Sequence, residues 1–374
     1  MTTDEKVALI KRNLAEILSE ENLYSLIDSG TPLRHYIGFE ISGKLHIGYL
    51  FTLLKVKDLQ DAGAETVIWL ADLHSAINDK LGGDLENIKK AAMGYFVDSF
   101  KALFKSIGGD PDKLIFKLTS ETYAQNPSFW LTLLEIGKTT TLARTKRSTT
   151  IMGRSDSDDS MPTDKLFYPI MQAADIFLLG TNIAHAGIDQ RKVHVIAIDA
   201  AMQVKTNPLK DAKGNQIKPV AIHHPILLGL TGPTGETEGK VDELAMKNKM
   251  SKSKPGSGIS VHDTPEEIKQ KINAAYAPEG VVENNPILNW TKYLVFYDTN
   301  AQMTIKRPEK FGGDITYKSY NELESDYGEK KLHPMDLKIA MAEWLINILE
   351  PVRTAFEEPQ KKANLELIES LTAK

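Results

Sequence analysis

Short apolar segments alternate with longer segments of helical periodicity over the first half of the chain. Three apolar runs are typical of strands buried in a sheet, namely His35–Glu40, Thr66–Ala71 and Leu114–Leu118. Helical periodicity follows each of the first two runs, over His46–Ala62 and Leu85–Phe104. Two more helices are expected over Asp164–Leu179 and about 189–204, and a last strand over Pro219–His223. This alternation predicts an α/β fold built on a parallel sheet.

The pattern changes near residue 260, where helices alone follow. Thr264-Pro265-Glu266-Glu267 has the residues of a helix start, with threonine as N-cap, proline at the first position and glutamate at the third. Two stretches lack periodicity. Residues 122–160, with the acidic tract SDSDDS, are expected to be irregular, and residues 231–258 are expected to form a loop. We therefore predict one domain over residues 1–260, with an inserted region at about 120–160, and a mostly helical domain over 261–374.

Composition narrows the classes of function. The chain has 374 residues, a formal net charge of −5 and no cysteine, which excludes disulfides, cysteine-ligated zinc and thiol nucleophiles. The charge argues against wholesale wrapping by nucleic acid, although a local basic face can still bind RNA. The N-terminus lacks the apolar core of a secretory signal, and no apolar run reaches about 18 residues. We expect a cytoplasmic protein that does not span a membrane.

The first candidate for chemistry is Gly43-Lys44-Leu45-His46-Ile47-Gly48, between a predicted strand and a predicted helix. Ligands bind at this edge of a parallel sheet, where the helix N-terminus offers unpaired N–H groups to a phosphate. His46 can donate a hydrogen bond to a phosphate oxygen, and Gly48 lets a ring approach the backbone. A plain strand-to-helix turn would also explain the glycines. GxGxxG and GxxxxGK[ST] are both absent, so neither a dinucleotide site nor a P-loop is indicated.

The second candidate is Lys249-Met250-Ser251-Lys252-Ser253, inside the predicted loop. Lysines and small hydroxyl residues on a loop can neutralise a triphosphate during nucleotidyl transfer. A solvated basic loop is the alternative explanation.

The third candidate is a polar stripe on an otherwise apolar helix. Tyr168, Gln172 and Asp175 follow a spacing of i, i+4 and i+7, which places them on one helical face. Buried polar groups need partners, and either the protein or a ligand must supply them. The histidines offer no clear metal site, and we interpret His185, His194, His223 and His224 as structural.

His46-Ile47-Gly48 and the later KMSKS together resemble the HIGH and KMSKS signatures of class I aminoacyl-tRNA synthetases. The chain further resembles the archaeal and eukaryotic type of tyrosyl-tRNA synthetase in HYIGFEISGKLHIG, LADLH, FYPIMQAADI, DQRKVHVIAID, RPEKFGGD and LHPMDLK. The resemblance implies a Rossmann-like catalytic domain followed by an α-helical anticodon-binding domain. One departure is Tyr49, which replaces the second histidine of the signature and leaves one imidazole for the phosphates.

The resemblance also implies roles for individual residues. Tyr36 and Asp175 match the pair that holds the phenolic hydroxyl of tyrosine, and Gly38 matches the floor of its pocket. Tyr168, Gln172 and Gln190 match the group that holds the α-ammonium. For ATP, the matching residues are His46, Gly48, Lys249, Ser251 and Lys252, of which His46, Gly48, Lys249 and Lys252 are expected to act in catalysis. For tRNA, they are Arg147 near the acceptor end and Phe311, His333, Pro334 and Asp336 around the first anticodon base.

The implied activity is tyrosine–tRNA ligation, with ATP and tRNA as substrates. Mg²⁺ is expected to accompany ATP without a protein-ligated metal, and the family implies a homodimer that meets through residues 120–150. An aspartate beside a tyrosine hydroxyl favours a substrate with a hydroxyl group, because phenylalanine would leave both groups unpaired. Three alternatives stay open, namely a tryptophanyl-tRNA synthetase, an inactive synthetase-like RNA-binding protein, and another nucleotidyl transferase of the superfamily.

Overall fold

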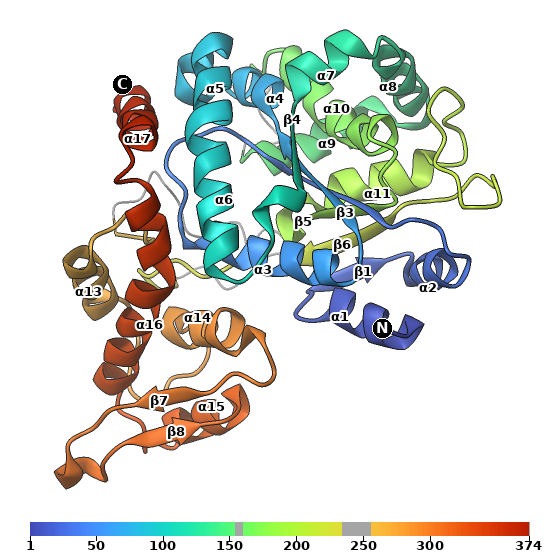
Figure 1. Ribbon diagram of the computed structural model, residues 1–374. Coiled ribbons are helices and arrows are strands. Elements are labelled where there is room, and N and C mark those ends of the chain that lie inside the picture. Colours follow the sequence, from blue (N-terminus) through green and yellow to red (C-terminus); the bar gives the residue numbers. More distant parts are fainter. Residues whose placement is uncertain (154–159, 234–255, 374) are drawn as a thin grey trace.

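A six-stranded sheet forms the centre of the molecule in the computed structural model, which describes residues 1–153, 160–233 and 256–373 (Figure 1). The strand order is β1-β6-β5-β2-β3-β4. The strands are β1 (Glu16–Leu18), β2 (Arg34–Phe39), β3 (Glu65–Leu70), β4 (Leu114–Leu118), β5 (Ile183–Gly187) and β6 (Val220–His224). All neighbours pair in parallel except β1, which is antiparallel to β6. The predicted α/β fold with a parallel sheet is therefore confirmed, although β1 and β5 were not predicted.

The order of connections reverses between β2 and β5. The chain runs outward from β2 through β3 to β4, and it then returns to place β5 on the other side of β2. In open parallel sheets, this reversal opens a crevice at the carboxyl ends of the two strands, and ligands bind there.

Helices cover both faces of the sheet (Figure 1). Successive side chains of each strand alternate between these two faces. Ile37 and Ile68 pack on the face that carries α3 and α6, whereas Tyr36 and Trp69 pack on the face that carries α10 and α11. The helices of this part are α1 (Thr3–Lys11), α2 (Glu20–Asp28), α3 (Ile47–Asp61), α4 (Asp72–Ile77), α5 (Leu85–Ala91), α6 (Val97–Ser106), α7 (Thr119–Gln125), α8 (Ser128–Thr139), α9 (Leu142–Ser148), α10 (Asp164–Leu178) and α11 (Arg191–Ala200).

One prediction about regularity was wrong, and one predicted helix has an unexpected turn within it. Residues 122–153 are helical rather than irregular, because Phe129, Leu133 and Ile136 recur at helical spacing and bury one face of α8 against α10. The predicted helix Leu85–Phe104 is divided by a π-helical turn at Ala92–Phe96. Gly94 lies in that turn, and a Cβ there would come within 2.9 Å of Asn364. Most of the acidic tract at 155–160 lies outside the described residues.

The C-terminal part is mostly helical and adds a small antiparallel sheet. Its helices are α13 (Pro265–Ala274), α14 (Pro286–Tyr293), α15 (Tyr320–Gly328), α16 (Pro334–Ala355) and α17 (Pro359–Thr372), and its strands are β7 (Met303–Ile305) and β8 (Ile315–Tyr317). The capping box at Thr264 is present as predicted. One apolar core runs from the α3 face of the sheet into this part, so the division into domains near residue 260 stays a prediction.

A buried ionic cluster joins three distant segments of the chain. Asp58 of α3 accepts hydrogen bonds from Lys55 Nζ at 2.8 Å, from the hydroxyl of Tyr297 at 2.5 Å and from the guanidinium of Arg12. Arg12 follows α1 and Tyr297 lies in the C-terminal part, while Asn13 Nδ2 donates to the Tyr297 carbonyl at 2.9 Å. Burial lowers the pKa of Lys55 to about 8, against the opposing pull of Asp58. The cluster therefore links the C-terminal end of α3 to the segment after α1 and to the C-terminal part of the protein.

The last helix, α17, returns to the sheet-containing part and lies beside α5 (Figure 1). Glu369 of α17 forms an ion pair with Lys44, two residues before His46, at 2.8 Å. No helix within the described residues is long and apolar enough to cross a membrane.

Candidate active site

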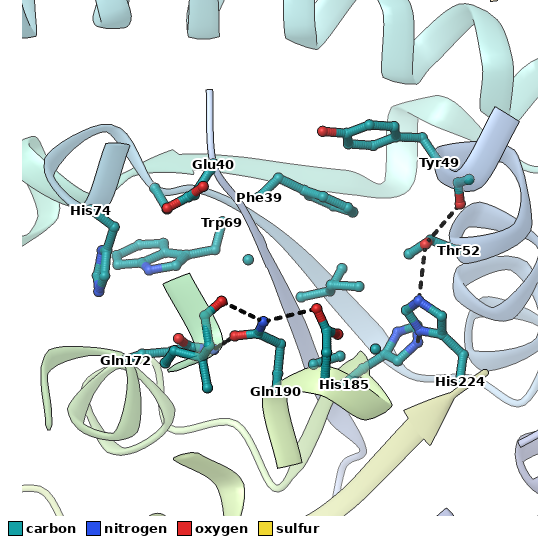
Figure 2. Close-up of a pocket in the computed structure, with 18 of the residues that line it drawn as sticks. Phe39, Glu40, Tyr49, Thr52, Trp69, His74, Gln172, His185, Gln190 and His224 are labelled. Carbon is teal, nitrogen blue, oxygen red and sulfur yellow. Dashed lines mark hydrogen bonds between the residues drawn. The ribbon is translucent and has the colours of Figure 1, made fainter. Parts of the chain in front are cut away.

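A cavity of about 660 Å³ opens at the carboxyl ends of β2 and β5, where the strand connections reverse. Figure 2 shows Trp69 and His74 at one end of it, and Tyr49, Thr52 and His224 at the other. Gln172 and Gln190 lie between these two ends. The cavity lining includes nine of the sequence-predicted residues, which are Tyr36, Gly38, His46, Gly48, Tyr168, Gln172, Asp175 and Gln190 together with Tyr49 of the altered signature.

Strand β2 supplies one wall through alternate residues. Tyr36, Gly38 and Glu40 follow a spacing of two and share one face of the chain at the end of β2, and Ile37 and Phe39 on the other face also line the cavity. The Tyr36 hydroxyl has no hydrogen-bond partner among the described residues. A Cβ on Gly38 would meet only Trp69 Cδ1, at 3.5 Å, within 4 Å. The protein itself therefore leaves room for a side chain at residue 38, and its glycine keeps that space in the cavity.

Glu40 was not predicted as a site residue, although its spacing from Tyr36 and Gly38 indicates it. Its carboxylate accepts hydrogen bonds from the Tyr168 hydroxyl at 2.9 Å and from Asn78 Nδ2 at 2.8 Å. Lys80 Nζ lies 3.5 Å away. A partly exposed carboxylate in the cavity wall can bind a cation.

Helix α10 carries the polar stripe, and each of its members has a partner in the protein. Tyr168 donates to Glu40, and Gln172 Nε2 donates to Gln190 Oε1 at 3.4 Å (Figure 2). Gln190 Nε2 donates in turn to the Ile151 carbonyl at 3.2 Å. Protein groups thus supply partners to the stripe, and the side chains of the stripe also line the cavity. Both explanations of the stripe, a network within the protein and a ligand site, therefore apply together.

Asp175, the third member of the stripe, is 1 % exposed. It accepts hydrogen bonds from the Tyr123 hydroxyl at 2.5 Å and from Trp69 Nε1 at 2.9 Å. Burial raises the pKa of Asp175 to about 8, and these two donors act to lower it. Neither Tyr123 nor Trp69 was predicted, because they reach Asp175 only through the packing of α7 and β3 against α10.

His74 lies at the same end of the cavity, in LADLH, and it was not predicted either. Its Nε2 is 3.8 Å from Asp175 Oδ2, and its ring meets the Tyr168 ring edge to face at a centroid distance of 4.7 Å. Neither ring nitrogen has a hydrogen-bond partner among the described residues. Burial lowers the pKa of His74 to about 4, so the ring is neutral near pH 7.

The opposite end of the cavity is the start of α3. His46 is the N-cap, and its Nδ1 accepts a hydrogen bond from the Gly48 N–H at 3.1 Å. In a neutral ring the proton then lies on Nε2, which makes that nitrogen a donor. Tyr49 packs its ring against Phe39 at 5.5 Å and Phe100 at 5.9 Å between centroids. The altered signature position thus contributes aromatic packing beside the cavity.

The backbone of this turn pairs with the segment that follows the predicted loop. Ile47 N donates to the Ile259 carbonyl at 2.9 Å, and Val261 N donates to the Leu45 carbonyl at 3.1 Å. On the other side of the loop, Leu230 N donates to the Ser257 carbonyl at 2.9 Å. Lys249, Ser251 and Lys252 lie outside the described residues, but the flank that follows their segment pairs with the start of α3, and the flank that precedes the segment is bonded to that later flank.

Three buried histidines form a hydrogen-bonded row that ends at α3. Thr52 Oγ1 donates to the Gly48 carbonyl at 3.1 Å, so it can only accept from His224 Nε2, at 3.3 Å (Figure 2). Burial lowers the pKa of His224 to about 4. In the neutral ring Nδ1 must then accept, and it does so from His185 Nε2 at 2.8 Å.

The same reasoning continues into the sheet. Burial lowers the pKa of His185 well below its ordinary value, so its Nδ1 accepts from His35 Nε2 at 3.2 Å. His35 Nδ1 in turn accepts from the Thr66 hydroxyl at 3.1 Å. Every bond in the row therefore points the same way, from Thr66 toward α3.

A second pair of histidines lies on β6 and α11. Glu16 accepts from His223 Nδ1 at 3.0 Å, so His223 Nε2 must accept from His194 Nδ1, also at 3.0 Å. Burial lowers the pKa of His223 to about 4. The histidines interpreted as structural thus belong to two hydrogen-bonded networks, of which the first reaches the cavity through His185 and His224.

The residues assigned to tRNA lie away from the cavity. Arg147 is exposed on α9. Phe311 is 62 % exposed in a turn that closes through Gly312, at a φ of +96° that favours glycine. His333 caps α16, Pro334 is its first residue, and Asp336 lies in its first turn. Arg307 joins the two segments, donating to the carbonyls of Gly313 at 3.0 Å and Lys331 at 3.3 Å.

Comparison with known proteins places this site in a family. The family described as "tRNA synthetases class I (W and Y)" matches residues 28–350. A tyrosine–tRNA ligase of Thermococcus kodakarensis is 52 % identical over 363 residues, covering 96 % of each chain. One of Pyrococcus horikoshii is 47 % identical over 376 residues, covering 99 % of each.

Solved structures agree with the sequence comparison. The crystal structure of tyrosyl-tRNA synthetase complexed with L-tyrosine from P. horikoshii has a TM-score of 0.94 to this chain, with 47 % identity and coverage of 99 % of this chain and 100 % of that one. Tyrosyl-tRNA synthetase from Aeropyrum pernix has a TM-score of 0.81 at 36 % identity, covering 98 % and 99 %. The chain therefore belongs to the class I tRNA synthetases of the tryptophan and tyrosine group.

Proposed function

We infer that this chain is a tyrosine–tRNA ligase, which activates L-tyrosine with ATP and then transfers the tyrosyl group to tRNA. The single observation that carries the choice of tyrosine is that the Tyr36 hydroxyl, which has no partner among the described residues, and the Asp175 carboxylate lie close together in the lining of the cavity. Relatives at about half identity over nearly the whole chain are tyrosine–tRNA ligases. Tryptophan has no hydroxyl group to satisfy this pair, so the tryptophanyl alternative is disfavoured.

At the tyrosine end, the proposed substrate lies along β2 and α10. Its phenolic hydroxyl would meet Tyr36 and Asp175, and its ring would occupy the space above Gly38. Its α-ammonium would lie among the oxygen atoms of Tyr168, Gln172 and Gln190. Tyr168, Gln172 and Gln190 themselves supply no negative charge to balance the ammonium. Glu40 supplies one beside them, because its carboxylate accepts a hydrogen bond from the Tyr168 hydroxyl.

At the nucleotide end, the proposed ATP lies at the start of α3. The helix N-terminus offers positive potential, and His46 Nε2 is the donor nitrogen that faces the phosphates in this proposal. Lys249, Ser251 and Lys252 would approach from the other side, because the flank that follows their segment is bonded to Ile47 and Leu45. ATP is the substrate that class I tRNA synthetases share.

Magnesium would come with the nucleotide. Among the described residues there is no group of three or more histidine, aspartate or glutamate side chains placed to hold a metal ion. Mg²⁺ keeps several waters and binds readily through substrate phosphates. In this proposal the triphosphate and water, rather than a protein cage, hold the ion and spread the charge of the phosphates.

The chemistry needs no general base for its first step. The tyrosine carboxylate attacks the α-phosphorus of ATP, a bond to the α-phosphate forms, and pyrophosphate leaves. The terminal ribose hydroxyl of tRNA then attacks the carbonyl carbon, and AMP leaves. Rate enhancement comes from positioning and from stabilising charge on the phosphates, the role given to His46, Lys249 and Lys252.

The proposed contacts with tRNA are on two separate surfaces. Arg147 would contact the acceptor end. Phe311, with His333, Pro334 and Asp336, would surround the first anticodon base. The link that Arg307 makes between their segments supports a common surface.

The proposed partner is a second copy of the chain. Trp130, Leu131 and Leu134 on α8 are each more than half exposed, and Leu142 on α9 is 71 % exposed. Such a patch marks an interface in a protein that must stay in solution. We expect Leu134→Glu to convert a dimer to a monomer in sedimentation velocity, whereas Met93→Glu, on another exposed apolar residue, leaves the dimer intact.

Amino-acid-dependent ATP–pyrophosphate exchange tests the activity. We expect exchange with tyrosine and none above background with tryptophan. Exchange with tryptophan alone would replace the proposal by its closest alternative, and exchange with no amino acid would favour an inactive RNA-binding protein. Lys252→Ala should slow exchange far more than it weakens tyrosine binding, and equal losses would argue against its role at the phosphates. The lack of cysteine fits work in the reducing cytoplasm.

A further inference from the structure

Two hydrogen-bond donors that the sequence did not predict bond to the carboxylate of Asp175. The Tyr123 hydroxyl donates to Oδ1 at 2.5 Å, and Trp69 Nε1 donates to Oδ2 at 2.9 Å. All three side chains are 3 % exposed or less. Tyr123 comes from α7 and does not line the cavity, whereas Trp69 and Asp175 do.

We propose that Tyr123 and Trp69 are positioning residues for amino-acid selection, which hold Asp175 as an oriented acceptor for the substrate hydroxyl. This inference rests on the proposed tyrosine–tRNA ligase function. A carboxylate offers about four acceptor positions on its two oxygen atoms. The two protein donors occupy one position on each oxygen, and the remaining positions are left for a ligand.

The chemistry of the two donors favours the ionised carboxylate. The indole N–H of Trp69 can only donate, so Oδ2 must accept. A proton on either oxygen of Asp175 would weaken that oxygen as an acceptor for its donor. Both bonds oppose the effect of burial, which raises the pKa of Asp175 to about 8. Loss of either bond therefore makes the neutral acid more abundant near pH 7.

Other titratable groups around Asp175 contribute no charge near neutral pH. They come from three elements besides α7, and they are Tyr36 on β2, His74 on α4 and Tyr168 on α10 itself. Burial raises the pKa of both tyrosines well above the ordinary value, and it lowers the pKa of His74 to about 4. Burial, followed by the interaction with Asp175, raises the pKa of Tyr123 well above its ordinary value, so that hydroxyl stays protonated as a donor.

Packing keeps the donors in place. The Tyr123 ring stacks on Phe129 with ring centroids 3.6 Å apart and planes 12° from parallel. Trp69 lies on β3, paired with Gly38 of β2. Asp175 is thus unable to turn away from the cavity without breaking two hydrogen bonds in a rigid environment.

This restraint bears directly on the rejection of phenylalanine. Phenylalanine would leave the free acceptor positions of Asp175 and the Tyr36 hydroxyl unpaired in a closed site, which is costly. Discrimination of this kind is well known, and tyrosyl-tRNA synthetases are its standard example. A carboxylate that could rotate or take up a proton would avoid part of that cost. Holding it fixed, with a smaller share of the neutral acid than it would have without the two donors, keeps more of that cost.

Tyr123→Phe removes one oxygen atom and tests the inference. We expect kcat/KM for tyrosine in ATP–pyrophosphate exchange to fall about tenfold, as for loss of one hydrogen bond to a charged group. The value for phenylalanine should not fall, so the tyrosine-to-phenylalanine ratio falls about tenfold. The pH at which kcat/KM for tyrosine is half-maximal should also move upward. A purely structural role would change neither the ratio nor this pH.

Tyr327→Phe is the matched control. Tyr327 is buried and hydrogen-bonded to Asn285 at 3.1 Å and to the Pro278 carbonyl at 2.9 Å, far along the chain from the cavity. It should lose stability without changing the ratio. Trp69→Phe carries the same test should Tyr123→Phe fail to fold. If the wild-type enzyme activates tyrosine and the variant leaves the ratio and the pH profile unchanged, the inference is wrong. If the wild-type enzyme is inactive with tyrosine, the proposed function itself is wrong.

Discussion

His262 is a partly buried histidine whose replacement by phenylalanine should stabilise the protein. Its ring lies between Tyr95 and Phe356, with centroids at 5.5 Å and 4.5 Å. Its Nε2 has no hydrogen-bond partner among the described residues. Burial, aided by the charge of Lys44, lowers the pKa of His262 to about 3. The site therefore accommodates an aromatic ring and gains nothing from that nitrogen.

The size of the gain depends on pH. At pH 7.5 the ring is neutral in both the folded and the unfolded protein, and removing an unpaired buried group is worth about 1 to 2 kcal/mol. The unfolded chain binds a proton near pH 6.5, while folded His262 does so only near pH 3. Wild-type stability from the neutral ring is therefore complete above pH 6.5 and is lost as pH falls. At pH 5.5 this adds about 1.4 kcal/mol to the advantage of phenylalanine.

Urea denaturation at pH 7.5 and pH 5.5 measures both contributions to stability, that of the unpaired nitrogen and that of protonation. His194→Phe is the comparison, because it deletes the N–H that His223 Nε2 accepts at 3.0 Å. It should show no gain at pH 7.5 but a similar change between the two pH values, since burial also lowers the pKa of His194. A His262→Phe protein that is less stable at pH 7.5, or that shows the same difference from wild type at both pH values, would refute this reasoning.

Three further substitutions separate binding from stability. Gly38→Ala should lower tyrosine affinity by more than about tenfold in calorimetry with little change in the urea midpoint, because its Cβ meets only Trp69 in the protein. Glu40→Gln should weaken tyrosine by about tenfold but leave 3-(4-hydroxyphenyl)propionate, which lacks the ammonium, unaffected; equal losses would contradict the role of Glu40. Tyr297→Phe should cost about 2 kcal/mol of unfolding free energy by deleting its bond to Asp58, and a neutral result would show that the ionic cluster stands without it.

Periodicity predicted most of the sheet, because strands buried on both faces have a distinct pattern. β2, β3, β4 and β6 lie close to the predicted bounds. β5 is a short run, Ile183–Gly187, that includes His185, and its polar residue is accommodated only by His35 and His224 on neighbouring elements. The helices between 119 and 148 were missed although Phe129, Leu133 and Ile136 carry a helical spacing.

The cavity residues likewise divide into those that the sequence could place and those that only tertiary packing brings to the site. Tyr168, Gln172 and Asp175 could be placed because they share a helix face, whereas Tyr36 and Gly38 were placed by the family resemblance. Glu40 obeys the same spacing as Tyr36 and Gly38 and was overlooked. Trp69, His74 and Tyr123 lie on elements whose contact with α10 is a product of tertiary packing, so no local pattern identifies them.

The row of histidines that ends at Thr52 has a consequence for how one site can sense another. A chain of neutral imidazoles has only two self-consistent settings, one for each direction of its protons. The Gly48 carbonyl selects one of them, because it takes the Thr52 proton. The tautomer of His35, buried beside Thr66, is therefore dictated by a carbonyl in the first turn of α3. A ligand that changed the hydrogen bonding of that carbonyl could reverse every proton in the row while the heavy atoms of the row stay in place, so that tautomers alone would carry the change through the sheet.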